Sequence, residues 1–431
     1  MKKKTAYVGI AGDILHEGHI NILKIASQYG KVIVGLLTDS AIASYKRLPH
    51  LNYKQREIII KNIKFVNQVI PQKTLDYTVN LKKITPDYVV HGDDWKQGIQ
   101  KNVREKVIQV LKKWNGRLIE PVYTKDISST FIKEKIFKTG ISPEIRRSKL
   151  KRLIDAKEFV RVIESHSALS SLIIENLSIF YKNRFLEYDA LWSSSLTDST
   201  LRGKPDNQSV DYSTRIFSLN DTLETTIKPI LFDGDNGGRI EHISYLVKNL
   251  EKIGVSALVL EDKKGLKLNS LFKDQKKSYQ DNIKDFCKKI EVAINYRISK
   301  DFMIIARIES LILGKSIKDA LHRAEKYSAA GADAIVIHSK KEKPDEIFKF
   351  AKIFSKSKFF KPMIAIPSTY SKTYEEQLIK NHFKIVIYAN HMLRASYKAM
   401  HDTASKILIN SRSFETEKNI TSIKDILKII S

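Results

Sequence analysis

Short apolar runs alternate with amphipathic stretches over the first 140 residues of the chain. Ala6–Gly9, Val32–Leu37 and Tyr88–His91 have the length and composition of buried strands. The stretches with apolar residues at helical spacing are Ile20–Tyr29, Lys54–Ile63 and Val103–Trp114. Because strands that alternate with helices favour a parallel sheet covered on both faces, residues 1–140 are expected to form a doubly wound, Rossmann-like α/β domain.

Residues 141–157 interrupt this alternation. They are polar and strongly basic, and their Lys and Arg residues include Arg146, Arg147, Lys149, Lys151 and Arg152. We interpret them as a linker or as a leading helix of a second domain.

Eight short apolar runs recur between residue 158 and the C-terminus, with amphipathic helical stretches between them. The runs are Phe159–Ile163, Ala190–Ser194, Pro229–Phe232, Ala257–Leu260, Met303–Ala306, Ala334–Ile337, Pro362–Ile366 and Ile385–Tyr388. Eight strand-and-helix units over about 270 residues predict a (β/α)8 barrel of the TIM type for residues 158–431.

Six of these runs end in unusually polar residues. The polar ends are Ser194-Ser195, Asp233-Gly234-Asp235, Glu261-Asp262-Lys263, Arg307 with Glu309, His338-Ser339-Lys340 and Asn390-His391. Since a (β/α)8 barrel carries its active site at the carboxyl ends of its strands, six polar ends predict a site on that face.

Asp233 and Asp235 flank Gly234 after the third run, so both side chains point to one side. Two neighbouring carboxylates repel each other unless a cation or a shared proton compensates them, and oxygen ligands suit Mg²⁺. The alternative is a solvated Asp-Gly turn, which Glu261 after the next run makes less attractive.

Arg307 and His338 each leave a second reading open. The Arg307 guanidinium can clamp a carboxylate or a phosphate in a bidentate manner, or it can pair with Glu309. His338 can contact a substrate or can be an ordinary packed core histidine. The company of other polar strand ends favours substrate contacts for both residues.

The segment Glu261–Ser270 is the most informative part of the chain. It reads Glu-Asp-Lys, five further residues, then Asn-Ser. This resembles the signature of phosphoenolpyruvate mutases, which rearrange phosphoenolpyruvate into phosphonopyruvate and so make a carbon–phosphorus bond. The resemblance covers about residues 146–431. Further matching segments are Leu191–Ser199, Gly203–Asn207, Ala330–Ala334 and His338–Lys341.

The resemblance implies three sets of site residues in the barrel. Asp233 would bind Mg²⁺ directly, and Asp235 and Glu261 would bind it through water. The substrate-binding set would be Trp192, Ser194, Ser195, Leu196 and Ser270. The catalytic set would be Asp206, Lys267, Asn269, Arg307 and His338.

The chemistry of such an enzyme explains these residue types. A phosphoryl group must leave an enolate oxygen and be caught by a carbon of the same molecule, so positioning and charge stabilisation carry most of the catalysis. Mg²⁺ and Arg307 would stabilise the enolate oxygen, while Asp206 would face the migrating group. Lys267, Asn269 and Ser270 would lie on a loop that closes and keeps water out.

The same superfamily also contains carbon–carbon lyases and phosphonopyruvate hydrolases. The lyases carry a cysteine in their active site, whereas Cys287 lies in a helix-like stretch and is expected to be structural. Asn269 within the intact signature favours a mutase over a hydrolase.

His16-Glu17-Gly18-His19 follows the first predicted strand and opens a helix. It resembles the HxGH motif of nucleotidyltransferases, in particular cytidylyltransferases, where two imidazoles and a helix N-terminus face a triphosphate. A Gly-Asp after a later strand and an ISTT-like helix start also match. The implied nucleotide-binding residues are Asp13, His16, His19, Asp93, Ser128, Ser129 and Thr130.

Departures from the family pattern before the HxGH motif and before the ISTT-like segment leave the nucleobase and the acceptor open, although CTP and Mg²⁺ are the expected partners. Lys46 and Arg56 are either phosphate contacts or solvated charges.

The composition limits the possible partners and the compartment. The formal charge is +27, but the Lys residues are spread along the chain and no nucleic-acid-binding motif is present. The single cysteine fits a reducing cytoplasm, and the apolar runs are too short to span a membrane. A homo-oligomer, tetramer or dimer through the barrel, is implied only by the resemblance.

We therefore expect a bifunctional enzyme of phosphonate biosynthesis. The barrel would isomerise phosphoenolpyruvate with Mg²⁺, and the N-terminal domain would transfer a nucleotidyl group to a downstream phosphonate. The alternatives are a phosphonopyruvate hydrolase and a basic nucleic-acid-binding protein on a degenerate enzyme scaffold.

Overall fold

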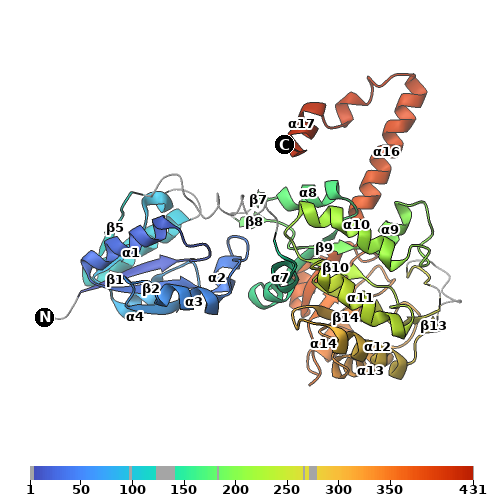
Figure 1. The fold of residues 1–431 in the computed structure, drawn as a ribbon, viewed down its shortest axis with the longest axis horizontal. Coiled ribbons are helices and arrows are strands. Elements are labelled where there is room, and N and C mark those ends of the chain that lie inside the picture. Colours follow the sequence, from blue (N-terminus) through green and yellow to red (C-terminus); the bar gives the residue numbers. More distant parts are fainter. Residues whose placement is uncertain are drawn as a thin grey trace. The chain divides into compact units, whose positions relative to one another are not determined.

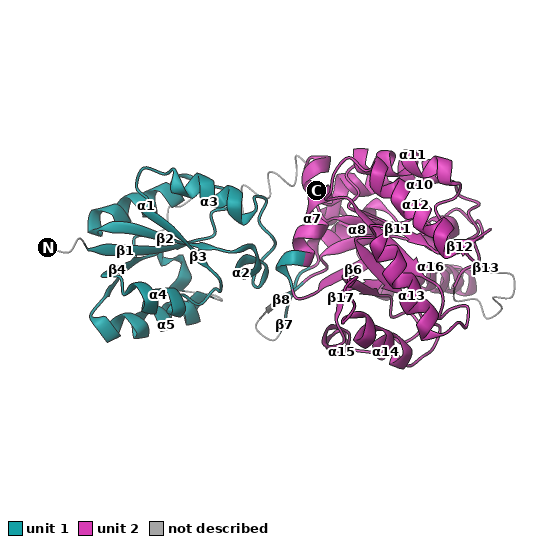
Figure 2. Cartoon of the chain, turned by 90° about the horizontal axis from the view of Figure 1, so that it is seen from below, with its two compact units in different colours: residues 1–140, 155–157, 178–186 teal, residues 141–154, 158–177, 187–431 magenta. Residues whose placement is uncertain are grey.

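A computed structural model of the chain describes residues 4–96, 100–122, 141–181, 184–265, 267–270 and 279–430. The chain forms two compact units, coloured separately in Figure 2. The first comprises residues 1–140, 155–157 and 178–186, and the second comprises residues 141–154, 158–177 and 187–431.

The first unit contains a five-stranded, entirely parallel sheet of order β3-β2-β1-β4-β5 (Figure 1). The strands are β1 Thr5–Ile10, β2 Lys31–Leu37, β3 Gln68–Gln72, β4 Tyr88–Val90 and β5 Arg117–Ile119. The predicted doubly wound parallel sheet is confirmed.

Both faces of this sheet are covered because successive residues of β1 point to opposite sides. Ala6, Val8 and Ile10 pack in one core with α1 and α3, and Tyr7 packs in a second core with α4 and α5. The helices are α1 Glu17–Tyr29, α2 Asp39–Ala43, α3 Tyr53–Lys61, α4 Thr78–Ile84 and α5 Lys101–Leu111, with short 3-10 helices η1 Asp93–Lys96 and η3 Lys112–Trp114. The three predicted helices correspond to α1, α3 and α5 with η3.

The second unit is built around a closed barrel of eight parallel strands. Its order is β6-β9-β10-β11-β14-β15-β16-β17, and β17 pairs with β6 to close the ring. The strands are β6 Val160–Glu164, β9 Ala190–Ser193, β10 Ile230–Asp233, β11 Ala257–Glu261, β14 Met303–Ile308, β15 Ala334–Ile337, β16 Met363–Ala365 and β17 Phe383–Tyr388. Each of the eight predicted runs coincides with one barrel strand, so the (β/α)8 prediction is confirmed.

The barrel strands are followed by helices (Figure 1), and two short antiparallel ribbons, whose strands are labelled in Figure 2, are separate from the two parallel sheets. The helices after β6 to β16 are α8 Ala168–Asn176, α9 Ser195–Thr200, α10 Tyr212–Thr225, α11 Ile240–Lys252, α12 Ile283–Tyr296, α13 Ile317–Ala329, α14 Asp345–Phe354 and α15 Glu375–Lys380. The ribbons are β7 Ile179–Tyr181 with β8 Arg184–Leu186, and β12 Lys263–Lys264 with β13 Tyr279–Gln280.

The basic segment after residue 140 forms helix α7, Pro143–Ala156. Its basic side chains donate to backbone carbonyls near the amino-terminal ends of β10 and β11. Arg146 reaches Leu223 O and Thr226 O at 2.9 and 3.1 Å, and Lys149 reaches Ile227 O at 2.9 Å. Part of the positive charge of the chain therefore stabilises the fold through hydrogen bonds to backbone carbonyls. This weakens the interpretation of the basic residues as a nucleic-acid-binding surface.

The chain ends in α16 His391–Asn410, the 3-10 helix η4 Glu417–Asn419 and α17 Ile423–Ile430. Of the 20 residues of α16 only Leu393 is buried, and α17 buries none. Large apolar side chains remain exposed on both helices, with Leu408, Ile409 and Ile423 at least 80% exposed. No helix in the described part of the chain is long and apolar enough to cross a bilayer.

Candidate functional site

The carboxyl ends of the barrel strands surround a small cavity of about 50 Å³, enough for a few water molecules. The predicted residues that line it are Trp192, Ser194, Ser195, Leu196, Asp206, Asp233, Lys267, Asn269, Ser270, Arg307 and His338. The sequence did not single out Ile366, Ser368 and Ala389, which complete the lining with Asn390. The two remaining predicted metal ligands, Asp235 and Glu261, lie next to this lining, as the contacts below show.

The end of β10 places two carboxylates side by side. Oδ2 of Asp233 accepts the Ser195 hydroxyl at 2.9 Å, and Arg215 lies 3.7 Å from Oδ2 of Asp235. Gly234 lies between them in close contact with β11, where an added Cβ would lie 2.4 Å from Leu258 Cδ1 and 3.0 Å from Val259 O. Tight packing of β10 against β11 therefore fixes the position of both acids.

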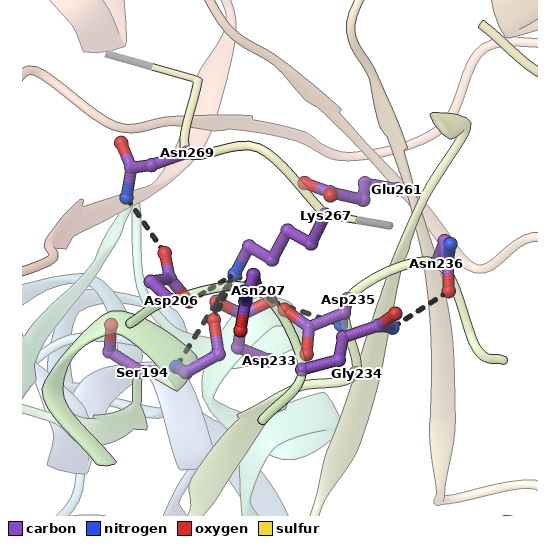
Figure 3. Close-up of polar contacts among 12 residues, drawn as sticks. Ser194, Asp206, Asn207, Asp233, Gly234, Asp235, Asn236, Glu261, Lys267 and Asn269 are labelled. Atoms are coloured by element: carbon purple, nitrogen blue, oxygen red, sulfur yellow. Dashed lines mark hydrogen bonds and ion pairs between the residues drawn. The ribbon is translucent and has the colours of Figure 1, made fainter. Parts of the chain in front are cut away.

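Lys267 extends into this carboxylate cluster from the segment 267–270, which we call the lid segment (Figure 3). Its ammonium lies 2.5 Å from Asp235 Oδ1, 3.1 Å from Asp206 Oδ1 and 3.9 Å from Asp233 Oδ2. Asn269 of the same segment donates to Asp206 Oδ2 at 2.8 Å. The lid segment thus covers the cavity through contacts with acids from two other parts of the barrel.

These contacts set the protonation of the cluster. Burial alone would raise the pKa of Asp233, but Lys267, Arg307 and Arg215 outweigh burial and hold it at about 2. Burial and the neighbouring Asp233 raise the pKa of Asp235 above its usual value, against Lys267. The pair therefore depends on nearby positive charge to stay ionised.

Glu261 at the end of β11 is 1% exposed, and neither of its carboxylate oxygens has a hydrogen-bond partner among the described residues. Burial raises its pKa to about 7, against the opposing effect of Arg307, whose Nη2 lies 3.6 Å away. An ionised carboxylate that is buried without hydrogen-bond partners destabilises the fold unless a bound ligand compensates its charge.

The three acids fit a divalent cation bound mainly through water. In the described part of the chain no three His, Cys, Asp or Glu side chains converge as direct ligands on one point. The resemblance implies one direct carboxylate, Asp233, with Asp235 and Glu261 acting through water, and Mg²⁺ usually keeps several waters. The orphaned oxygens of Glu261 supply hydrogen-bond acceptors for such waters.

On the other side of the cavity, Arg307 and His338 supply donors. Arg307 is held by Glu309 through an Nε–Oε1 contact of 2.7 Å, so the ion pair that the sequence offered as an alternative exists beside the cavity position. His338 is 4% exposed and its Nδ1 has no partner among the described residues. Burial and Arg307 lower the pKa of His338 to about 3, so this imidazole is neutral.

The N-terminal unit has a larger cavity, of about 270 Å³, between the ends of β1 and β4 and the start of α1. The sheet order reverses between these two strands, which is where open α/β sheets bind ligands. His16 and His19 line it, with ring centroids 4.1 Å apart. Burial, His16 and Lys46 lower the pKa of His19 to about 4, and the Nδ1 atoms of both histidines lack partners among the described residues.

Other predicted nucleotide-binding residues lie elsewhere. Asp13 accepts from the backbone amides of His50 and Leu51 at 2.6 and 3.3 Å and does not line the cavity. Asp93 begins η1 outside the lining, which instead contains its neighbours Gly92 and Asp94. Ser128, Ser129 and Thr130 lie outside the described residues.

Lys46 lines the cavity, but Arg56 is neither a phosphate contact nor a solvated charge. Its guanidinium is fully buried and bonds to Leu37 O at 2.8 Å and to Asp39 at 2.5 Å. The sequence analysis also missed Tyr45, Tyr77, His91 and Gln100, which line the same cavity. Of these only His91 carried a signal, because it directly precedes the Gly92-Asp93 pair that matches the nucleotidyltransferases.

Comparison with known proteins identifies the family to which the barrel belongs. Residues 150–408 match the phosphoenolpyruvate phosphomutase family, and the chain belongs to that family. A phosphoenolpyruvate phosphomutase of Tetrahymena pyriformis is 31% identical over 68% of this chain and 93% of its own length. The crystal structure of a phosphoenolpyruvate phosphomutase from Streptomyces platensis subsp. rosaceus has a TM-score of 0.60 and 30% identity, covering 66% of this chain and 94% of that one. A phosphonopyruvate hydrolase solved with oxalate and Mg²⁺ has a TM-score of 0.58 and 28% identity, with the same coverage.

The N-terminal part is a cytidylyltransferase-like domain, since residues 11–135 match that family. A glycerol-3-phosphate cytidylyltransferase of Bacillus spizizenii is 37% identical over 98 residues, which are 22% of this chain and 74% of that protein. The chain is therefore an enzyme of the phosphoenolpyruvate mutase superfamily that also carries a cytidylyltransferase-like domain.

Proposed function

We propose that the barrel isomerises phosphoenolpyruvate to phosphonopyruvate in a Mg²⁺-dependent reaction. The observation that carries this proposal is the lid segment, whose Lys267 and Asn269 both contact Asp206 beside the cavity. A phosphoryl group in transit between oxygen and carbon must be kept from water. A lid that contacts the residue expected to face that group meets this need.

Five of the residues that line the cavity then have a role in binding the substrate. Ser194, Ser195 and Leu196 would hold the substrate carboxylate and enol oxygen at the start of α9. Neutral His338 would donate one hydrogen bond to a substrate oxygen, and Arg307 would balance negative charge on the enolate. The O–P bond breaks and the C–P bond forms within one molecule, so no proton or co-reactant is consumed.

Bound Mg²⁺ would supply positive charge beside the enolate oxygen. Asp233 would be its direct ligand, and Asp235 and Glu261 would hold its water molecules. This division of ligands is the one that the resemblance implies. The orphaned Glu261 oxygens and the dependence of the Asp233–Asp235 pair on nearby positive charge support a cation there.

A single incubation separates mutase from hydrolase. The protein is mixed with phosphonopyruvate and Mg²⁺, and the products are followed by phosphorus NMR. Phosphoenolpyruvate is the expected product, whereas pyruvate with inorganic phosphate would replace the proposal by the hydrolase alternative. Steep, salt-dependent nucleic-acid binding without turnover of either compound would favour the nucleic-acid alternative.

For the N-terminal domain we propose nucleotidyl transfer from CTP to a downstream phosphonate. The paired neutral imidazoles of His16 and His19 at the start of α1, with Lys46 in the same cavity, support a triphosphate there. The test measures pyrophosphate release from CTP, ATP, GTP and UTP with a panel of phosphonates. Release from CTP with a phosphonate acceptor is expected, and no release from any combination would leave the domain a binding module only.

A further inference from the structure

Two residues of the signature have no part in the proposed chemistry, although both are buried. Asp262 is 0% exposed and Lys263 is 2% exposed, and neither lines the barrel cavity. Burying two charged side chains outside the reacting centre is costly unless each has a defined partner. Both side chains have such partners in the structure, which belong to the lid segment and to the barrel wall.

Lys263 holds the lid segment from beneath. Its ammonium donates to the backbone oxygen of Leu268 at 2.8 Å and to Ser270 Oγ at 2.9 Å. It also lies 3.2 Å from Glu309 Oε2. One buried ammonium therefore binds two points of the lid segment and one acid of the barrel.

Glu309 connects Ser270 of the lid segment to Arg307, which is predicted to hold substrate oxygens. Its Oε1 accepts from Arg307 Nε at 2.7 Å, and its Oε2 accepts the Ser270 hydroxyl at 2.5 Å. The Ser270 oxygen in turn accepts from Arg307 Nη2 at 2.8 Å. The hydroxyl of Ser270 is thus shared by Lys263, Glu309 and Arg307.

Asp262 keeps the base of this arrangement fixed. Its Oδ2 accepts from Tyr327 at 2.8 Å, from Gln280 at 2.8 Å and from Arg323 at 3.1 Å, and its Oδ1 accepts the Glu309 amide at 2.9 Å. Tyr327 and Arg323 belong to α13, so the stem before Lys263 is anchored to the barrel wall. Any movement of the lid segment must then occur relative to Lys263.

We propose that Lys263 and Glu309 form a latch that holds residues 267–270 over the cavity and couples their position to Arg307. The inference rests on the proposed function, since Arg307 is taken to hold substrate oxygens. When a substrate anion engages Arg307 Nη2, Ser270 loses that donor and relies on Lys263. Lys263 is therefore a positioning residue that keeps the lid segment closed during turnover.

The test compares Lys263→Met with Lys264→Met. Methionine keeps the length of the side chain but removes the ammonium, and Lys264 is the adjacent, exposed lysine on the same short strand. Both variants are first checked by thermal melting. If Lys263→Met does not fold, Lys263→Gln, which keeps a donor without the charge, replaces it.

We expect Lys263→Met to lower kcat for phosphonopyruvate by about 10- to 100-fold, because lost positioning costs rate more than affinity. KM should change by less than about threefold. The share of pyruvate and phosphate among the products should rise, since water then reaches the migrating group. Lys264→Met should match the unaltered protein in all three measurements, and equal behaviour of the two variants would overturn the latch.

A double-mutant cycle with Ser270→Ala separates a latch from a general structural effect. If Lys263 acts through Ser270, the Ser270→Ala substitution should lower kcat at least about fivefold less in the Lys263→Met background than in the unaltered protein. Additive effects would refute the coupling. Formation of pyruvate and phosphate alone by the unaltered protein would defeat the proposed function, and the cycle would then judge the latch on the kcat of that hydrolysis.

Discussion

The ammonium of Lys267 lies 2.5 Å from Oδ1 of Asp235, inside the acidic cluster proposed to bind Mg²⁺. Burial would lower the pKa of Lys267, but Asp235, Asp233 and Asp206 raise it well above its usual value, so the group is a permanent cation. With Mg²⁺ on the proposed ligands, Lys267 would compete with the metal for Asp233 and Asp235, so its ammonium would have to shift when the metal enters.

This competition predicts the effect of Lys267→Met on metal binding. Without the tethered ammonium the carboxylates lose their internal counter-ion, so Mg²⁺ should bind the substrate-free protein at least about tenfold more tightly, or about 1.4 kcal/mol. Isothermal titration calorimetry measures this, with Lys264→Met as the charge-matched control. Unchanged or weaker Mg²⁺ binding by Lys267→Met would show that the lysine does not compete.

The two proposed sites predict separable losses of activity. Asp233→Ala should lower mutase turnover by at least about 10²-fold, because it removes the proposed direct metal ligand. It should leave pyrophosphate release from CTP intact, and His19→Ala should have the reverse effect. Both reactions are measured on each folded variant. Loss of both activities in either folded variant would contradict the two-site arrangement.

The buried His338 predicts a pH dependence of stability. Its pKa of about 3 in the folded protein is below the ordinary value of 6.5. The folded state therefore gains stability above about pH 6.5 and loses it as the pH falls, because only the unfolded chain binds the proton. Between pH 6.5 and 4.5 this loss should amount to roughly 2–3 kcal/mol.

Comparison of the unaltered protein with His338→Gln in denaturant melts at both pH values gives this quantity. The free energy of unfolding should fall more steeply with acid in the unaltered protein. His401→Gln, at an exposed histidine of α16, is the control and should leave the pH dependence unchanged. Parallel curves for His338→Gln and the unaltered protein would show that this imidazole is already protonated in the folded state.

The exposed C-terminal helices predict self-association, as the resemblance also implies. Leu408 and Ile409 of α16 are 81% and 80% exposed, and apolar groups of this size normally gain a covering surface. We expect a dimer or tetramer by light scattering, and Leu408→Glu should reduce its mass. Asn410→Glu adds the same charge at a polar position and should not. A monomeric unaltered protein would refute this prediction.

The barrel could be predicted because most positions in its strands are buried and apolar on both faces of the sheet. Edge strands carry a weaker signal. β3 contains Pro71 and β5 has only three residues, and both lie at the edges of the N-terminal sheet, so neither was predicted. An edge strand such as β3 or β5 pairs with only one neighbouring strand, so fewer of its side chains need to be apolar.

The site was predictable where chemistry requires rare residue combinations at strand ends, as at Asp233 and Glu261. The role of a residue could not be predicted where its side chain binds backbone carbonyls or side chains that only the fold brings close. Arg56 was expected to contact phosphate or to be a solvated charge, yet it donates from a buried position to the carbonyls of Leu51 and of Leu37, the last residue of β2. The partners of Lys263 lie 5, 7 and 46 positions along the chain, at Leu268, Ser270 and Glu309, and only the folded structure brings them together.

Helix α7 determines where the chain can be cut to obtain the barrel alone. A fragment that starts at residue 158 would omit α7 and leave the carbonyls of Leu223, Thr226 and Ile227 without their charged donors. Each such loss costs about 1.5–3 kcal/mol, a large part of the stability of an ordinary domain. A fragment that starts at residue 141 keeps these donors, so the practical boundary for separate expression of the two domains lies before the helix.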